Sequence, residues 1–191
     1  MLTANQRVLT LGEQSTRSQE ETLIGSFKGK TPQIHKTAFV SQFAYIVGDV
    51  IIGQGSSVWP GTVIRGDMGR IIIGKNTNIQ DNCVVHTNAD GWIGDGVTIG
   101  HKVVWHGRKL ADNCLVGNGA IVNDGVEMGT YSVVAAGTVV LEETIIPEKS
   151  MVLGIPGKVV RETTERHWER IRDVAKNYVE KAHAYKEEKG L

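Results

Sequence analysis

Apolar residues recur at every sixth position along most of this chain, a period that fits neither an α-helix nor the alternation of an ordinary strand. The frame runs from Ile34 to Val140, with short insertions near Met68–Arg70 and Asn88–Trp92. Its apolar positions are Ile34, Val40, Ile46, Ile52, Val58, Ile64, Ile73, Ile79, Val85, Ile93, Ile99, Trp105, Leu110, Val116, Val122, Met128, Val134 and Val140. A period of six predicts a parallel β-helix, in which three hexapeptides make one triangular coil and about six coils stack.

Glycine often follows the apolar position, and a small residue usually lies four places after it, as Gly53 follows Ile52 and Ser56 comes later in the same repeat. We expect the apolar and small side chains to point into a narrow prism. We expect glycine to supply unusual backbone angles at the corners. A β-sandwich of short strands is the alternative, but a sandwich does not keep one frame through this many repeats.

The repeats define the predicted organisation of the chain. Residues 1–22 are polar and without period, which predicts a flexible extension or an oligomer-wrapping arm. Residues 23–161 form the predicted all-β domain, starting with a strand within Leu23–Phe27. In residues 162–191, apolar residues recur at three and four positions, which predicts an amphipathic helix from about Thr164 to Lys189. We expect this helix to pack on the β-helix wall or at a subunit boundary.

Composition excludes several classes of function. Lysine plus arginine equals aspartate plus glutamate, at 21 each, which argues against a nucleic-acid or anionic-membrane partner. The chain has two cysteines, Cys83 and Cys114, which we expect to fill the core rather than form a disulfide framework. No signal peptide and no apolar run of about 20 residues is visible, so we expect a soluble, cytoplasmic protein.

Three of the six histidines fall close together in the sequence, at His86, His101 and His106. His86 follows Val85 and His106 follows Trp105, and these two apolar positions are one full coil apart. The two histidines should therefore stack on one face, while His101 should lie near a different corner. A pair from one subunit could then meet the single histidine of a neighbour, which predicts a trimer with up to three metal sites.

Three neutral imidazoles leave one coordination position open, as a catalytic metal requires. A water bound there would lose a proton near neutral pH. Zinc, ferrous iron and cobalt all suit such ligands. The alternative is that these are ordinary surface histidines, since motif matches have real false-positive rates.

Several short motifs together resemble the gamma-class carbonic anhydrase-like proteins over about Leu23–Arg161. They are Arg65-Gly66-Asp67, Asn78-Ile79-Gln80-Asp81, Val85-His86, Gly100-His101, His106-Gly107 and Gly154-Ile155-Pro156-Gly157-Lys158. The resemblance implies a left-handed β-helix, a homotrimer, and zinc or ferrous iron bound between subunits by His86, His101 and His106. It implies hydration of CO2 to bicarbonate.

The same resemblance assigns further residues. It places Gln80 beside the metal-bound water, with Asn78 helping to orient Gln80. Arg65, Asp67 and Asp81 resemble the family's interface ion pairs, and we expect them to hold the trimer together.

The chain departs from active members of that family at two places. Met68 stands where those members have a glutamate, and the loop Thr87–Trp92 is shorter than their acidic loop with a proton-shuttling glutamate. Without a shuttle, proton transfer to buffer slows. Two alternatives therefore stay open. One is a metal-free acyltransferase that uses one histidine as general base, and the other is a catalytically weak metal-binding trimer that serves as an assembly subunit.

Overall fold

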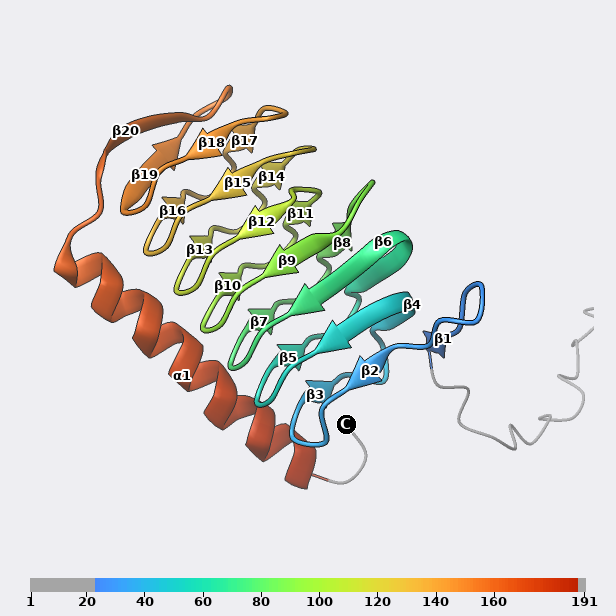
Figure 1. Ribbon diagram of the computed structural model, residues 1–191. Coiled ribbons are helices and arrows are strands. Elements are labelled where there is room, and N and C mark those ends of the chain that lie inside the picture. Colours follow the sequence, from blue (N-terminus) through green and yellow to red (C-terminus); the bar gives the residue numbers. More distant parts are fainter. Residues whose placement is uncertain (1–22, 189–191) are drawn as a thin grey trace, which may run out of the picture.

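The chain folds into a left-handed β-helix of about seven turns with one C-terminal helix along its side, in a computed structural model that describes residues 23–188 (Figure 1). The predicted fold is confirmed, but the sequence predicted about six turns. The repeat continues beyond Val140 through Ile146 and Val152, and both side chains are buried in the core. The predicted N-terminal extension, residues 1–22, lies outside the described residues.

The β-helix has three faces, numbered here in chain order. The first face contains β3 (Phe39–Val40), β5 (Ser57–Val58), β7 (Asn78–Ile79), β10 (Thr98–Ile99), β13 (Leu115–Val116), β16 (Val133–Val134), β19 (Ser150–Leu153) and the antiparallel β20 (Lys158–Glu162). The second face contains β1 (Ile24–Gly25), the first halves of β4 (Tyr45–Ile52) and β6 (Val63–Ile73), β8 (Val84–His86), β11 (Val104–Trp105), β14 (Ile121–Val122) and β17 (Val139–Val140). The third face contains β2 (Gln33–Ile34), the second halves of β4 and β6, β9 (Gly91–Ile93), β12 (Lys109–Leu110), β15 (Glu127–Met128) and β18 (Ile145–Ile146).

Two kinds of side chain fill the prism, as the repeat predicts. The apolar residues stack coil on coil, so that Ile64, Val85 and Trp105 lie on successive strands of the second face, all fully buried. The small inward residues bond to the backbone of the next coil. The Thr62 hydroxyl donates to the Gln80 carbonyl at 2.6 Å, and the Cys83 thiol lies 3.0 Å from the carbonyl oxygen of Gly100. These bonds tie neighbouring coils together inside the core.

The recurring glycines serve a different purpose from the one predicted. Gly53 and Gly74, which follow apolar positions, do not have positive φ angles. A Cβ on Gly53 would lie 2.5 Å from the carbonyl oxygen of Gly74, so glycine is needed because adjacent coils approach closely. Positive φ angles occur later in the repeat, at residues such as Gly55 and Asn76.

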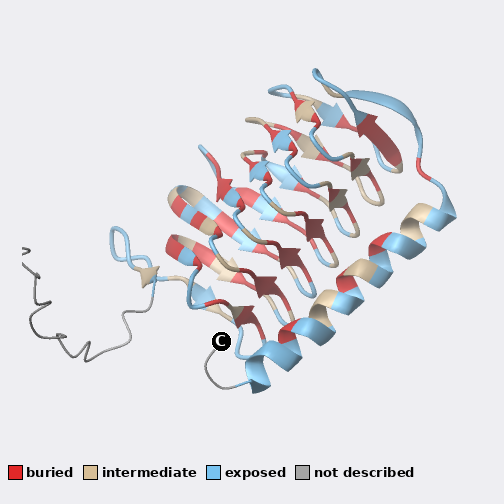
Figure 2. Cartoon of the chain, turned by 180° about the vertical axis from the view of Figure 1, so that it is seen from behind, coloured by how far each residue is buried: buried red, intermediate tan, exposed pale blue. Residues whose placement is uncertain are grey.

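The helix α1 (Glu165–Glu187) runs along the first face and buries Ile171, Ala175 and Ala182 toward the β-helix (Figure 2). Trp59 from the β-helix packs against Tyr178 and Tyr185 of α1, with ring centroids 5.4 and 5.1 Å away. The predicted amphipathic helix is thus confirmed, and it packs on the wall of its own chain. Over residues 23–188, no helix is long and apolar enough to cross a membrane.

Candidate metal site

His86 and His106 lie side by side at the corner between the second and third faces. His86 ends β8, His106 follows β11, and the in-register pair Val85–Trp105 joins these two strands. The ring centroids are 4.8 Å apart, and His86 Nδ1 lies 2.7 Å from His106 Nε2. The coil spacing predicted this stacking. His86 is buried, at 7% exposed, whereas the side chain of His106 is 26% exposed.

A carboxylate engages the outer nitrogen of each ring. Asp67 Oδ1 lies 2.9 Å from His86 Nε2, and Asp124 pairs with His106 Nδ1. Asp67 also forms an ion pair with Arg65. Because Asp67, His86, His106 and Asp124 lie on four successive coils, they form one line of side chains, called here the corner row.

The corner row presents two ring nitrogens to one point. When His86 Nε2 and His106 Nδ1 carry the ring protons and donate to their carboxylates, His86 Nδ1 and His106 Nε2 are unprotonated. The lone pairs of these two nitrogens then face each other. Burial lowers the pKa of His86, and the nearby Arg65 and His106 lower it further. The hydrogen bond to Asp67 acts in the opposite direction, but the pKa remains below its ordinary value. Neutral imidazole is the form that binds metals, so this donor set fits a metal that favours nitrogen ligands.

The pair does not complete a site by itself. Within residues 23–188 of one chain, no group of three or more His, Cys, Asp or Glu side chains is placed to hold a metal ion. A metal bound to the pair would need a further ligand from elsewhere.

His101 lies at the other edge of the second face, in the corner that follows β10. Its Nδ1 lies 2.9 Å from Asp81 Oδ2, and its backbone N–H donates to the side chain of Asn118 at 3.0 Å. Asp81 engages Nδ1, so Nε2 is the nitrogen that can bind a ligand. The side chain is 45% exposed, as a residue that reaches toward another subunit would be.

Asn78 and Gln80 belong to the same edge as His101. Asn78 lies in β7 on the first face, which α1 contacts, and Gln80 directly follows that strand. Both side chains are buried. Gln80 Nε2 donates to Asn78 Oδ1 at 3.0 Å, and Asn78 Nδ2 donates to Thr98 Oγ1 at 2.9 Å. This hydrogen bond fixes the amide of Gln80 at this edge.

Asp124 and Asn88 belong to the site but were not predicted from the sequence. Asn88 Nδ2 donates to Asp124 Oδ2 at 3.0 Å. Asp124 precedes Gly125, a pair typical of a turn, which gave no reason to single it out. The repeat gives no signal for Asp124 either, because Val122 pairs with Trp105 and Asp124 therefore lies one place past the position that corresponds to His106 on the next coil.

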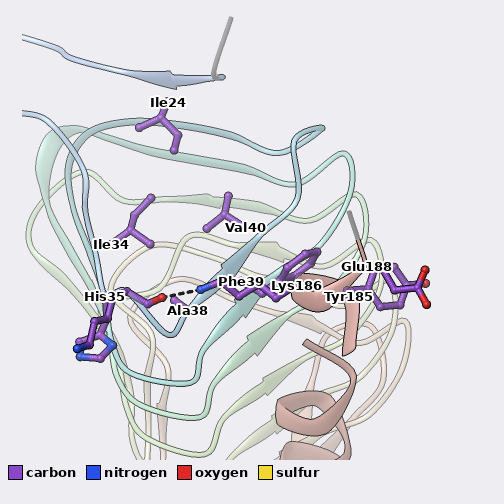
Figure 3. Close-up of a pocket in the computed structure, with 10 residues that line it drawn as sticks. Ile24, Ile34, His35, Ala38, Phe39, Val40, Tyr185, Lys186 and Glu188 are labelled. Carbon is purple, nitrogen blue, oxygen red and sulfur yellow. Dashed lines mark hydrogen bonds between the residues drawn. The ribbon is translucent and has the colours of Figure 1, made fainter. Parts of the chain in front are cut away.

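Two cavities accompany these residues. A cavity of about 370 Å³ adjoins His106 and is lined also by Arg108, Asp124 and Glu143. A larger cavity of about 560 Å³ lies at the end of the β-helix where the chain begins its coils, between the first coil and the end of α1 (Figure 3). Its lining is largely apolar, and the His35 ring there bonds within its own turn, with Nδ1 2.9 Å from Thr37 Oγ1. The first cavity is the one that meets the corner row.

Known proteins share the hexapeptide repeat and much of the sequence. The family model for bacterial transferase hexapeptide (six repeats) matches residues 31–66. The mitochondrial gamma carbonic anhydrase 2 of Arabidopsis thaliana is 42% identical over 179 residues, covering 90% of this chain and 64% of that longer protein. A carbonic anhydrase of Geobacillus kaustophilus is 44% identical over 169 residues, covering 86% of this chain and 91% of the relative. The chain belongs to the gamma-class carbonic anhydrase-like family.

The fold of this gamma-class carbonic anhydrase-like chain also occurs in proteins named as transferases. The crystal structure of a hexapeptide transferase family protein from Anaplasma phagocytophilum matches with a TM-score of 0.82 and 38% identity, covering 86% of this chain and 98% of that chain. The fold therefore does not select the reaction, which depends on the side chains that the fold carries.

The structure also places Met68, the short loop and Arg108 in this gamma-class carbonic anhydrase-like chain. Met68 follows Asp67 directly and is 65% exposed. Asp90 in the short loop accepts a hydrogen bond from the backbone N–H of Arg70 at 2.8 Å, so it anchors the loop. Arg108 lines the cavity beside His106 and pairs with Glu127.

Proposed function

We propose that the protein is a homotrimer that catalyses the reversible hydration of CO2 to bicarbonate at metal sites between its subunits. The observation that carries the proposal is the position of the two half-sites. The His86–His106 pair lies at one edge of the second face, and His101 lies at the opposite edge. Each half-site has its ring nitrogens held by carboxylates.

A threefold arrangement joins these half-sites. If three copies turn their second faces toward a common axis, the edge of each second face meets the opposite edge of the next. The pair from one subunit then faces His101 of its neighbour, and three equivalent sites result. This accounts for why one chain holds only part of a metal site.

The outward surface of the second face supports this arrangement. Six successive strands present an apolar residue there, half-buried or exposed, and these are Tyr45, Val63, Val84, Val104, Ile121 and Val139. The third face is mixed at the equivalent places, because the exposed Ile72 and Trp92 are followed by the charged Lys109 and Glu127. The helix α1 already contacts the first face. The second face is therefore the one best suited to bury against copies of the same chain.

The chain's own residues would divide the work at each site. His86 and His106 of one subunit and His101 of the next would hold the metal, for which zinc, ferrous iron and cobalt are all chemically suitable. When bound, the metal supplies a Lewis acid that lowers the pKa of a water. Because Gln80 and Asn78 share the edge of His101, the neighbour that supplies His101 would also supply the amide of Gln80 to orient the substrate.

The acidic residues at these edges would position the ligands. Within one chain, Asp67 holds His86, and Asp81 holds His101. We assign them this positioning role, with Arg65 holding Asp67. Their predicted role as ion pairs between subunits stays a prediction. So does the predicted cytoplasmic location, since the Arabidopsis relative is named as mitochondrial.

The decisive test is stopped-flow CO2 hydration by the trimer loaded anaerobically with ferrous iron or with zinc, beside a chelator-stripped control. We expect metal-dependent turnover that rises with buffer concentration, because Met68 replaces the glutamate that would help to move protons. A metal-loaded trimer without turnover would contradict the hydratase and favour an assembly subunit. Acetyl transfer from acetyl-CoA by the stripped protein would instead favour the transferase alternative.

A further inference from the structure

We infer that Asp124 is the positioning residue that aims His106 at the metal, and that Asn88 in the short loop holds Asp124 for this purpose. This inference rests on the proposed function, because it takes His106 to be a ligand. It gives the shortened loop a task other than proton shuttling.

The contacts of Asp124 fix its carboxylate at both oxygens. Oδ1 pairs with His106 Nδ1, and Oδ2 accepts a hydrogen bond from Asn88 Nδ2 at 3.0 Å. A carboxylate with both oxygens engaged cannot turn away from the ring without losing one partner. The loop that follows His86 thereby controls the orientation of His106, so the two halves of the pair are coupled.

The chemical effect of this contact is to choose the tautomer of His106. A carboxylate accepts but does not donate, so the proton of the neutral ring is held on Nδ1. The lone pair then resides on Nε2, which is the atom that faces His86. A carboxylate behind a histidine ligand also makes the ring a stronger donor to the metal.

The same cavity offers a matched control in Glu143. Its side chain packs over Gly125, where an added Cβ would lie 2.2 Å from Glu143 Oε1. Glu143 and Asp124 line one cavity and carry the same charge, but Asp124 is the one that accepts the hydrogen bond from His106 Nδ1. Glu143→Gln therefore removes a nearby negative charge but leaves the contact between Asp124 and the His106 ring in place.

The first experiment measures metal affinity by competition between the full-length protein and a chelating dye, using Zn²⁺ and Co²⁺. We expect Asp124→Ala to weaken binding by about 10- to 100-fold, the usual effect of losing a carboxylate behind a histidine ligand. Asp124→Asn keeps the shape and should weaken binding less, and Asn88→Ala should weaken it in the same direction. Glu143→Gln should bind like the wild type. Equal affinity of the wild type and Asp124→Ala would overturn the inference.

A second experiment needs no metal and keeps the two proposals separate. Nitrogen-15 NMR of the histidine rings in the metal-free protein should show His106 with its proton on Nδ1. Asp124→Ala should change this signal, whereas Glu143→Gln should not, with circular dichroism confirming that each variant is folded. If the wild type binds no metal, the proposed function fails. The nitrogen-15 signal of the His106 ring would still show whether Asp124 sets the tautomer of that ring. A His106 tautomer that does not respond to Asp124→Ala would reject that role.

Discussion

Val85 and Trp105 are paired in register on neighbouring coils, and this pair brings His86 against His106. Where three hexapeptides follow one another without insertion or deletion, the paired residues of adjacent coils are separated by 18 positions, as Leu115 and Val133 are. Val85 and Trp105 are separated by 20, and the two additional residues lie in the loop after His86. Because the loop absorbs them at the corner, the core keeps its register and the histidines stay aligned.

The proposed interface can be tested by placing a charge on the second face. Val104→Asp puts a carboxylate in the middle of the apolar row, at a side chain that is 36% exposed in the single chain. If that face is buried between subunits, an unpaired charge there costs several kcal/mol, so the trimer should dissociate and lose its metal. Sedimentation velocity measures the mass.

Ile72→Asp is the matched control for this substitution. Ile72 is 37% exposed but lies on the third face, so this variant should stay trimeric. Dissociation of Ile72→Asp together with an intact Val104→Asp trimer would show that the interface had been assigned to the wrong face.

The docking of α1 depends on one tryptophan. Trp59 is buried between Phe39 and two tyrosines of α1. Trp59→Ala should lower the free energy of unfolding by about 3–5 kcal/mol, as large-to-small changes in a packed core do. Trp92→Ala on the third face should cost less than about 1 kcal/mol, since Trp92 is 43% exposed and its ring lies under the Lys109 ammonium, an interaction that is weak at an exposed site. Urea unfolding at equal protein concentration measures both, and similar losses would contradict this account.

Much of this fold could be predicted because its repeat is local. The six-residue period fixes which side chains point inward, and that alone located β8, β11 and the pairing of Val85 with Trp105. The end of the β-helix was harder to predict, because Ile146 and Val152 keep the frame while Pro147 and Gly154 suggest a break. The recurring glycines were predicted to supply unusual backbone angles, whereas Gly53 and Gly74 are needed because neighbouring coils approach closely. This close approach depends on residues one turn away in the sequence.

The two cysteines should be unreactive in the folded protein. Burial raises the pKa of the Cys83 thiol to about 11 and that of Cys114 to about 12. Thiolate is the reactive form, so at pH 8 a thiol-reactive dye should label neither residue until urea unfolds the chain. Fast labelling of the native protein would contradict this.

The raised pKa of Cys83 also predicts how stability changes with pH. A folded-state pKa above the unfolded value of 9.0 means that the folded chain keeps a proton that the unfolded chain loses. The stability that the protonated Cys83 thiol contributes is therefore complete below pH 9 and is lost as the pH rises toward 11. Cys83→Ala should reduce this alkaline loss, which unfolding curves between pH 8 and 11 would measure.

The candidate site was only partly visible in the sequence. His86, His101 and His106 could be singled out by residue type and by coil counting. Asp124 could not, because it resembles a turn residue and its importance depends on a contact from the next coil. Nor does a single chain test whether His101 meets the pair, since that contact requires a second subunit.

A complementation experiment tests that last contact directly. His86→Ala and His101→Ala each remove one ligand from every site, so each variant alone should lose tight metal binding. Co-expression with two different affinity tags allows heterotrimers that contain both variants to be purified. In such a ring, one junction joins an intact pair to an intact His101, so metal content should return to about one third of the wild-type level.

The pairing of His86→Ala with His106→Ala provides the control. Both substitutions fall on the same edge of the second face, so no junction in a mixed trimer regains a complete pair. These heterotrimers should stay without metal. Recovery in the control, or its absence when His86→Ala is combined with His101→Ala, would show that the three histidines are not shared between neighbouring subunits. Recovery confined to the His86→Ala and His101→Ala mixture would place each metal between two chains, because only a shared site can be rebuilt from two defective subunits.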